Sequence, residues 1–393
     1  MGATTDHALG RNLRFFCKKE AAPGGAYGTD SQEALAGGDA AKVLSTSMEF
    51  TVARNDRMDS RTSRSVMERI TGKQEVSWSC ESYLLPKGST DAPDIDPFIE
   101  AAMGGSFGSP TTKTYKFSDS NALPTVHMMR TANGALREDL FGCYVEDMNI
   151  TASGGEEPKI SFSGGAFNYA LTGTGTVHGS TSVTTTSVPL VTGDGVNFMV
   201  GSTIDINTGS TIVTSKSAAD TLVVKTGGTY ANSEAITPET YTETGTGGNP
   251  VNGISGSLVL NGVTLPVTSF DVTVTNGLKA LSDEAFEKGT SDFVAGYRSV
   301  KGNISVRARK DFIKSLTQRY VQTTATADPT FSSVALVVTM GGVSGKKVVA
   351  TLSKIELDFA GIDVPEAEEA ILSLPFTALG TSGSDELTLA WNQ

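Results

Sequence analysis

The sequence predicts a mainly β (α+β) chain with two tandem copies of one β-rich domain, each with a helix, and an inserted small β domain. Composition favours strands, because 43 glycines in 393 residues, with frequent Thr, Ser and Val, are typical of short strands joined by tight turns. Apolar and polar residues alternate in Ser45–Val52, which predicts a strand with one buried face. The same alternation returns about 220 residues later in Val267–Val274, and further matching segments follow in the same order. This order predicts a tandem duplication.

The charge and the cysteine content argue against several classes of protein. The chain has 43 acidic and 31 basic residues and a net charge of −12, so we expect repulsion from nucleic-acid phosphates. Cys17, Cys80 and Cys143 show no CxxC spacing, which argues against a disulfide framework or a zinc site and favours folding in a reducing compartment. We find no apolar stretch typical of a signal peptide or a membrane span, so we expect no membrane binding by this chain.

The first 173 residues divide into an arm and a domain. Residues 1–36 mix Gly, Ala and charged residues without periodicity, so we expect an extended N-terminal arm that is either frayed or ordered on a neighbouring subunit. Residues 37–173 form the first predicted domain. Its predicted strands lie at 45–52, 75–84, 124–131, 142–151 and 159–164, with a polar projecting loop at 53–69 and a hairpin turn at 154–158.

A helix is predicted within the first domain, at residues 94–103. Asp96 is the expected N-cap, Pro97 is the first helical residue, and Gly104-Gly105 end the helix. The acidic start of this helix could also hold calcium, although capping already accounts for the same residues.

Residues 257–393 form the second predicted domain, which repeats the plan of the first. The strand at 267–274 leads into a long polar loop at 276–296. The other predicted elements are strands at 300–309 and 334–339, a helix at 311–316, a strand at 352–359 that matches 145–152, and a strand at 370–376 that matches 159–164.

A segment rich in Thr, Gly and Val separates the two copies at residues 174–256. Its short segments, including Met199–Ile206 and Thr221–Lys225, alternate as strands do. The flanks, Gly173–Thr176 and Gly245–Pro250, are typical of flexible linkers. We therefore expect an inserted surface β module that lies outside the main body.

The sequence predicts no catalytic, cofactor-binding or metal site, and we expect a protein that is not an enzyme. The GxSxG match at Gly104–Gly108 follows a helix, whereas a hydrolase nucleophile needs a turn from a strand into a helix. His7, His127 and His178 lie far apart, and none has a second histidine four residues further on. The sequence contains no phosphate-binding loop motif.

Two loops at corresponding places in the copies carry opposite charge. Loop 53–69 is positive and loop 279–292 is negative, because the first is rich in arginine and the second in acidic residues. Two explanations account for this difference. Either the loops are solvated and their composition has drifted, or they make complementary contacts between stacked subunits. The candidate stacking residues are Arg54, Arg57, Arg61, Arg64, Asp283, Glu284 and Glu287.

Four segments resemble those of bacteriophage tail tube proteins. They are the strand, loop and strand at 45–84, the helix start Asp94-Ile-Asp-Pro-Phe-Ile-Glu-Ala-Ala102, the hairpin at 143–164 and the strand at 370–380. The resemblance implies two tandem tail-tube-type β-sandwich or barrel domains, each with a flanking helix, in subunits that build rings stacked as a hollow tube for DNA passage. Because this chain holds two copies, it resembles the duplicated tube proteins of siphophages, which implies homotrimeric, pseudo-hexameric rings.

The resemblance also implies partners and a location. The chain would contact itself within and between rings, enclose the tape measure protein and DNA without adhering to them, and meet tail terminator and baseplate or tip proteins. It would be assembled in the bacterial host cytoplasm and reside in the virion tail. No cofactor is implied.

A tube of this family implies an inner wall that is polar and acidic, so that DNA slides without binding. Polar strand faces are candidates for this wall, although the sequence leaves open which face points inward. These candidate residues are Glu146, Asp147, Asn149, Lys354, Glu356 and Asp358. The alternative function is a secreted or surface β-rich protein, an adhesin or S-layer-like subunit, for which Thr/Gly-rich modules are equally ordinary. The missing signal peptide favours the tube.

Overall fold

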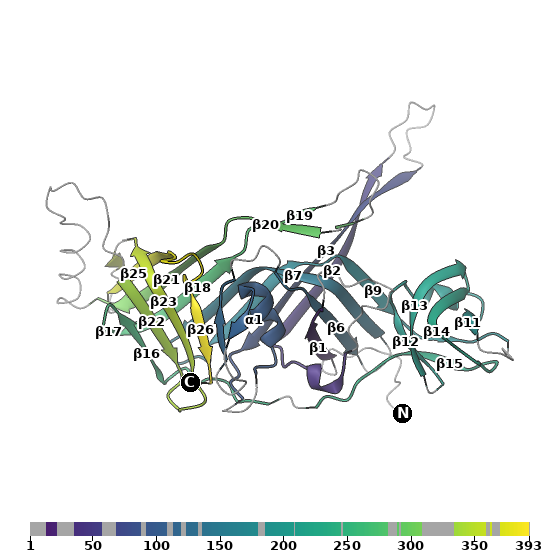
Figure 1. The fold of residues 1–393 in the computed structure, drawn as a ribbon, viewed down its shortest axis with the longest axis horizontal. Coiled ribbons are helices and arrows are strands. Elements are labelled where there is room, and N and C mark those ends of the chain that lie inside the picture. The colour runs from purple at the N-terminus through teal and green to yellow at the C-terminus, as the bar shows by residue number, and fades with distance from the viewer. Residues whose placement is uncertain are drawn as a thin grey trace.

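The computed structural model confirms a mainly β fold in which 18 strands belong to one hydrogen-bonded antiparallel system (Figure 1). A single α-helix lies among the described residues. The structure describes residues 13–21, 35–56, 68–87, 92–107, 113–118, 123–132, 136–179, 185–207, 209–244, 247–281, 289–290, 292–308, 334–358, 362–363 and 370–392.

Seven strands in the first half of the chain have counterparts in the second half. They are β1 (Leu13–Lys19), β2 (Ser45–Asp56), β3 (Arg69–Tyr83), β6 (Val126–Ala132), β7 (Leu136–Ser153), β8 (Lys159–Gly165) and β9 (Asn168–Thr172). Six antiparallel pairings connect them: β1–β6, β6–β7, β7–β9, β2–β3, β3–β8 and β7–β8. These pairings form two layers of strands. The long strand β7 takes part in both layers, because its first part pairs with β6 and β9 and its last part with β8.

The second half shows the same pattern in the same chain order. Its strands are β16 (Gly256–Leu260), β18 (Val267–Thr275), β21 (Ser299–Arg307), β22 (Val334–Met340), β23 (Val348–Leu357) with β24 (Ile362–Asp363), β25 (Ile371–Ala378) and β26 (Thr388–Trp391). The pairings are β16–β22, β22–β23, β23–β26, β18–β21, β21–β25 and, for β25, both β23 and β24. Each pairing of the first half therefore has a counterpart in the second.

Two strand contacts join the halves. The end of β7 pairs with β18, and β26 pairs with β5 (Thr114–Lys116). Figure 1 shows the halves side by side, with the long β2–β3 hairpin projecting from one end of the sheet. The remaining short strands of the body are β4 (Ser106–Phe107), β17 (Val263–Leu265), β19 (Leu278–Leu281) and β20 (Asp292–Ala295), and a 3-10 turn spans Gly37–Asp39.

The helix α1 (Asp96–Met103) fills the core of the first half. Phe98 is fully buried, and its ring lies 5.3 Å from that of Trp78 and 5.4 Å from that of Phe162 between ring centroids. Gly104 ends the helix as predicted, with φ +81°. The predicted N-cap was wrong, because Ile95 occupies that position.

Asp96 serves a different purpose from capping. Its carboxylate accepts a hydrogen bond of 2.6 Å from the Tyr115 hydroxyl and pairs with the Lys113 ammonium. Lys113 also reaches Glu100 at 3.0 Å, and Lys19 reaches Glu100 at 2.9 Å. The acidic start of the helix is thus neutralised by lysines, and the described residues contain no group of three or more His, Cys, Asp or Glu suited to a metal ion.

The segment between the copies forms its own six-stranded sheet with its own core. Its strands are β10 (Gly175–Thr176), β11 (Thr185–Pro189), β12 (Thr203–Ile206), β13 (Gly209–Ala218), β14 (Thr221–Gly228) and β15 (Ala235–Pro238), with a 3-10 turn at Asp194–Asn197. Buried Val188, Phe198, Ile204, Leu222 and Ile236 belong to a hydrophobic cluster separate from that of the main body. Figure 1 shows this segment at one end of the molecule, and we refer to it as the inserted module.

Three expectations about individual elements are corrected or lie outside the described residues. The expected arm contains β1, whose Phe15, Phe16 and Cys17 are buried. The expected polar loop at 276–296 contains the β19–β20 hairpin. The helix expected at 311–316 lies outside the part of the chain that the structure describes.

The expected match of 352–359 to 145–152 also needs correction. Ile355–Leu357 pair with Phe376–Ala378, at the far end of β25. Ile362 pairs with Leu372, as Met148 pairs with Phe162 in the first half. The counterpart of the end of β7 is therefore β24, and the first part of β23 corresponds to the first part of β7.

Candidate assembly surface

Eight strands lie side by side in the largest uninterrupted layer, with four strands from each half. Their order is β2-β3-β8-β7-β18-β21-β25-β24. We call this layer the joint sheet. All of its pairings are antiparallel, and the β7–β18 contact in its middle joins the two halves.

The β7–β18 contact is well fixed. Its register runs from Asp147 opposite Thr275 to Ser153 opposite Ser269. The Thr275 hydroxyl donates a hydrogen bond of 2.7 Å to the Asp147 carboxylate. Buried Asn276 adds three bonds, from its backbone N–H to the Glu146 carbonyl and from its side-chain amide to the carbonyls of Val145 and Ala102. These bonds set both the register and the end of β18.

The two faces of the joint sheet differ in chemistry, because side chains alternate across a strand. One face packs into the core through buried residues that include Met48, Trp78, Phe162, Met148, Phe270, Ile304 and Leu374. The other face is polar, and we call it the polar face. It carries Ser47, Glu49, Thr51, Glu75, Ser77, Ser79, Glu81, Ser161, Ser163, Lys159, Asp147, Asn149, Asp271, Thr273, Lys301, Asn303, Ser305, Arg307, Ser373 and Thr377.

Acidic groups outnumber basic groups on the polar face. Lys159 lies 3.6 Å from Glu81 across neighbouring strands. Partial burial raises the pKa of Asp271 above its ordinary value, and burial together with nearby Asp147 raises the pKa of Glu146. The resulting surface is mostly hydrophilic and biased toward negative charge, and it includes Tyr83, which lies opposite Lys159.

The structure places the candidate wall residues as follows. Asp147 and Asn149 lie on the polar face, opposite Ser163 and Ser161 of β8. Glu146 lies at the register shift between Val145 and Asp147, so it is the extra residue of a bulge. In β23, Glu356 lies opposite Thr377 of the polar face. Lys354 and Asp358 alternate with the inward-facing Ile355 and Leu357.

Of the candidate stacking residues, the structure describes Arg54 alone. Arg54 lies on the distal part of β2, opposite Thr71, and is exposed. The residues outside the described part of the chain are Arg57, Arg61, Arg64, Asp283, Glu284 and Glu287. The bases of the two loops adjoin within one chain, because Gly289 lies against the Gln74 carbonyl of β3.

The β19–β20 hairpin docks on the first half through an aromatic cluster that the sequence did not predict. The Phe293 ring lies 5.3 Å from Tyr144 and 6.0 Å from Phe167 between centroids. Leu278 and Leu123 complete the cluster. The segment 276–296 is mostly polar, and its two phenylalanines, Phe286 and Phe293, show no regular alternation, so the sequence gives only a weak signal for this contact.

The outer edge of β2 is open. Among the described residues, β2 pairs with β3 and with no other strand. Phe50 and Val52 are only half-buried, whereas their counterparts Val272 and Val274 on β18, which has a neighbour on both sides, are both 0% exposed. The apolar residues of β2 therefore lack the cover that β7 provides for β18.

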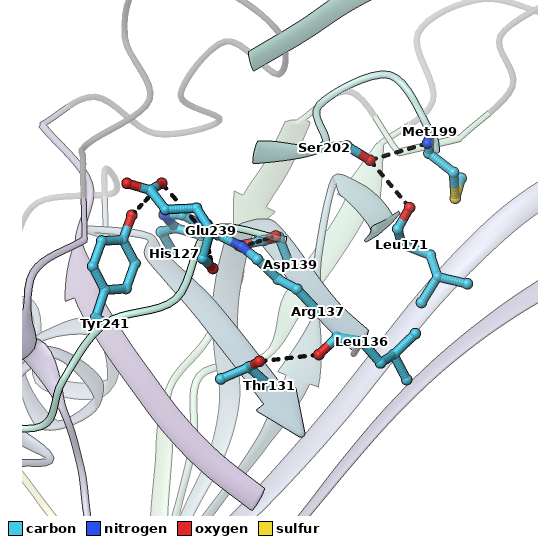
Figure 2. A network of polar contacts seen from close by, with 10 residues as sticks. All are labelled: His127, Thr131, Leu136, Arg137, Asp139, Leu171, Met199, Ser202, Glu239 and Tyr241. Atoms are coloured by element: carbon cyan, nitrogen blue, oxygen red, sulfur yellow. Dashed lines mark hydrogen bonds and ion pairs between the residues drawn. The ribbon is translucent and has the colours of Figure 1, made fainter. Parts of the chain in front are cut away.

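A second polar cluster attaches the inserted module to the first half (Figure 2). Arg137 and Asp139 of β7 are 1% and 0% exposed, and their side chains make hydrogen bonds of 2.7 and 2.9 Å. His127 lies 3.1 Å from Asp139 on the other side. Arg137 also binds Glu239, 3.5 Å away, whose carboxylate accepts a hydrogen bond from Tyr241.

The chemistry of this cluster is that of a structural ion pair. Burial favours protonation of Asp139, but Arg137 and His127 outweigh burial, and the pKa of Asp139 lies below its ordinary value. The same carboxylate raises the pKa of Arg137 despite its burial. Ser202, shown in Figure 2, donates to the Leu171 carbonyl and accepts from the Met199 N–H. It therefore links the inserted module to β9.

No helix among the described residues is long and apolar enough to cross a membrane. A cavity of about 230 Å³ adjoins the Arg137 cluster, and a larger one of about 540 Å³ lies where the end of β7 meets the start of β18. No protein-family model matches the chain, and no curated protein sequence matches it.

Proposed function

We propose that the chain is the structural subunit of a phage tail tube, in which three copies form a pseudo-hexameric ring and the rings stack around a channel for DNA. The observation that carries the proposal is the joint sheet, which unites four equivalent strands from each half and presents one continuous polar face. A layer of this kind is suited to the wall of a channel.

The matching pairings of the two halves support a duplicated tube domain. Six pairings in the first half have counterparts in the second, in the same chain order. Two equivalent units joined by a strand contact occupy two neighbouring positions around a ring. Heterologous contacts of this kind close into a ring when the rotation between neighbours is a whole fraction of a turn.

The chemistry of the polar face supports passage of DNA. A protein holds DNA mainly through Lys and Arg contacts to phosphates, and each contact retained along a channel would slow the strand. Acidic groups outnumber basic groups on the polar face, and Lys159 lies beside Glu81. DNA would therefore move past the wall without being bound.

The β2–β3 hairpin is the proposed contact between rings. It extends beyond the joint sheet in Figure 1, and its distal residues Arg54, Asp56 and Arg69 are exposed. Because the bases of the arginine-rich loop of this hairpin and of the acidic loop after β19 adjoin within one chain, we assign both loops to one face of the ring, where they would meet the opposite face of the next ring. Charge attraction would orient successive rings in one direction.

Negative-stain microscopy and native mass measurement of the purified chain test this proposal. We expect rings or tubes with a central channel, and ring masses that are multiples of three chains. A ring of six chains would contradict the assignment of two ring positions to each chain. Monodisperse single particles at all concentrations would favour the surface-protein alternative and remove the tube.

A further inference from the structure

We infer that Lys113 and Asp96 join through an intrachain isopeptide bond, in which the Lys113 Nζ and the Asp96 Cγ form an amide with loss of one water molecule. Glu100 lies beside the reacting groups and transfers the protons. The groups come from the first turn of α1 and from the residue before β5. The bond forms within one chain, so it does not depend on ring assembly.

The three side chains meet at the start of α1. The Lys113 ammonium pairs with the Asp96 carboxylate and lies 3.0 Å from the Glu100 carboxylate. Asp96 and Glu100 are four residues apart in α1, so their carboxyl groups lie on the same face of the helix. The side chains of Lys113, Asp96 and Glu100 are only 15%, 22% and 11% exposed, which limits access of water to the reacting groups.

The backbone holds the amine and the carboxyl in place. The Lys113 carbonyl accepts a hydrogen bond of 2.7 Å from the Trp391 N–H, and Asp96 begins α1 with Pro97 directly after it. Groups held in contact react as parts of one molecule, with effective concentrations on the order of 10⁵–10⁸ M in well-oriented cases. This proximity favours an amide that separate molecules would not form in water.

The surroundings activate the Asp96 carboxyl for attack. Burial raises the pKa of Asp96, and the opposing effects of Lys113 and Tyr115 do not offset it. The protonated acid is the form that an amine can attack. Tyr115 donates a hydrogen bond of 2.6 Å to the Asp96 Oδ1, and burial raises the pKa of Tyr115, which keeps its hydroxyl a donor. This donor faces the oxygen on which negative charge develops.

The condensation needs no reagent beyond these groups. Glu100 accepts a proton from the Lys113 ammonium and passes it to the Asp96 carboxylate, which leaves a neutral amine beside a neutral acid. The amine nitrogen attacks Cγ, and the N–C bond forms. Glu100 then carries a second proton from this nitrogen to the hydroxyl on Cγ, the C–O bond breaks, and water leaves. The products are an amide and ionised Glu100, so atoms and charge balance and no group is oxidised or reduced.

Pro97 removes the common alternative reaction of an aspartate. An aspartate side chain can cyclise onto the backbone N–H of the next residue, which forms a succinimide and also releases water. The Pro97 nitrogen carries no hydrogen, so this ring cannot form at Asp96. Loss of water at Asp96 therefore reports condensation with Lys113.

The chain also contains a matched pair that should not react. The Lys87 ammonium contacts the Asp94 carboxylate, and their side chains are 14% and 2% exposed. The charges that act most strongly on Asp94 are those of Lys87 and Lys42, and neither is a carboxylate that could take up the lysine proton. Lys87 and Asp94 should therefore remain an ion pair.

The bond would strengthen the junction between the halves. β5 pairs with β26 of the second half, and α1 lies in the core of the first half. An amide between Asp96 and Lys113 ties β5 covalently to α1. The strand contact of the second half is then anchored to the core of the first.

Mass spectrometry of the full chain, purified and then unfolded, tests the bond. We expect the wild type to be lighter than its sequence by one water molecule, and Lys113→Arg and Glu100→Gln to have their full masses. Trypsin should not cleave after Lys113 in the wild type, which leaves a fragment of residues 88–116 that lacks one water. Lys87→Arg, the matched control, should keep the deficit.

Two further measurements identify the linked carboxyl. Asp96→Asn should lose ammonia in place of water, because the amine then displaces the amide nitrogen. Dilute acid cleaves Asp–Pro bonds with help from the free aspartate side chain, and the chain has two such bonds, Asp96-Pro97 and Asp328-Pro329. The wild type should be cleaved at Asp328 alone, whereas Lys113→Arg should be cleaved at both. Acid cleavage is made on unfolded chains, so it does not require that the variant folds.

The outcomes are decisive for the bond. A wild-type chain of full mass that trypsin cleaves after Lys113 would overturn it. A water deficit that persists in Lys113→Arg would place the dehydration elsewhere and would overturn it too. A deficit lost in Lys113→Arg but kept in Glu100→Gln would support the bond and contradict proton transfer by Glu100. Rings in the microscope and the mass of a single chain vary independently, so failure of the bond would leave the tube standing.

Discussion

At the scale of single residues, the Arg137–Asp139 pair shows how a charged sequence can be completely buried. The run Leu136-Arg-Glu-Asp139 reads as a solvated strand, yet Arg137 and Asp139 are 1% and 0% exposed. The cover comes from the linker after the inserted module, through Glu239 and Tyr241. Contacts between segments about 100 residues apart leave no periodic signal, so sequence reasoning could not find this site.

Removing one member of this pair should be costly. We expect Arg137→Met to lower the free energy of unfolding by about 3–5 kcal/mol, because it leaves the Asp139 carboxylate buried without its main partner. Denaturant unfolding measures the loss. Arg69→Met, which breaks the exposed pair with Asp56, is the matched control and should change stability by about 1 kcal/mol or less. Equal losses in both variants would contradict the structural role of the buried pair.

The same pair predicts a pH dependence of stability. The pKa of Asp139 in the folded protein lies below its ordinary value of 3.8, so its ionised form stabilises the fold above that pH. The stabilisation is lost as the pH falls through the lower, folded pKa. We therefore expect the stability difference between the wild type and Asp139→Asn to be largest at neutral pH and to shrink below about pH 4. A difference that stays constant down to pH 3 would argue against ionised Asp139.

At the scale of elements, the end of α1 depends on backbone conformation, which sequence can predict. Gly104 has φ +81°, and an added Cβ would lie 2.8 Å from the Ser118 Cβ. Gly155 has φ +91°, but no atom lies within 4 Å of an added Cβ. The two glycines therefore share a conformational requirement and differ in packing.

Alanine at these two glycines should separate the two effects. Gly155→Ala should destabilise the fold by about 1 kcal/mol, the cost of placing a side chain in a left-handed conformation. Gly104→Ala should cost clearly more, because it adds a clash of side chains within a packed region. Thermal or denaturant unfolding of both variants checks the order, and a larger loss for Gly155→Ala would refute the packing argument.

Sequence alternation located most strands but could not assign all of their partners. The strands around Met48, Trp78 and Phe270 were predicted because their buried faces alternate regularly. The alternation of β23 slips between Leu352 and Ile355, which are both buried although three residues apart. This irregularity shifted the expected match, and only the pairing with β25 identifies β24 as the counterpart of the end of β7.

At the scale of the whole molecule, the inserted module has a hydrophobic core of its own, but the linker that follows it packs against the main body. The module holds its own hydrophobic cluster, whereas Tyr241 packs on Phe16 and Val251 is buried in the main core. The Val177 N–H also bonds to the Glu234 carbonyl at 2.9 Å, so the two ends of the module lie next to each other. The effect of a deletion on stability should therefore depend on whether the deletion includes this linker.

Two deletions should therefore behave differently. Replacing 178–233 by a short Gly-rich turn keeps Glu239, Tyr241 and Val251, and we expect a folded protein that still assembles. Deleting 178–250 removes Glu239 and Tyr241, uncovers the Arg137–Asp139 pair, and should lower stability markedly. Unfolding measurements and negative-stain microscopy of both variants test this. Loss of assembly in the shorter deletion would show that the module itself holds the rings together.

The charge of the polar face gives a last prediction that belongs to the assembled molecule. Glu49 and Glu75 lie on neighbouring strands of this face, opposite Ser77 and Thr51. If the face lines a channel, Glu49→Lys/Glu75→Lys should still assemble, because neither side chain enters the core, but its tubes should retain short duplex DNA at low salt. Release of counterions makes such binding weaken steeply as salt rises, so co-sedimentation across a salt series measures it.

The control for this prediction changes the charge equally elsewhere. Glu157→Lys/Glu243→Lys alters two exposed glutamates that lie off the polar face, in the β7–β8 turn and in the linker. These tubes should carry the same net charge as the first variant and retain less DNA, because the three copies of each lysine in a ring would surround a DNA strand only when they face into the channel. Equal retention by both variants would mean that net charge alone governs binding and that the polar face lies on the outside.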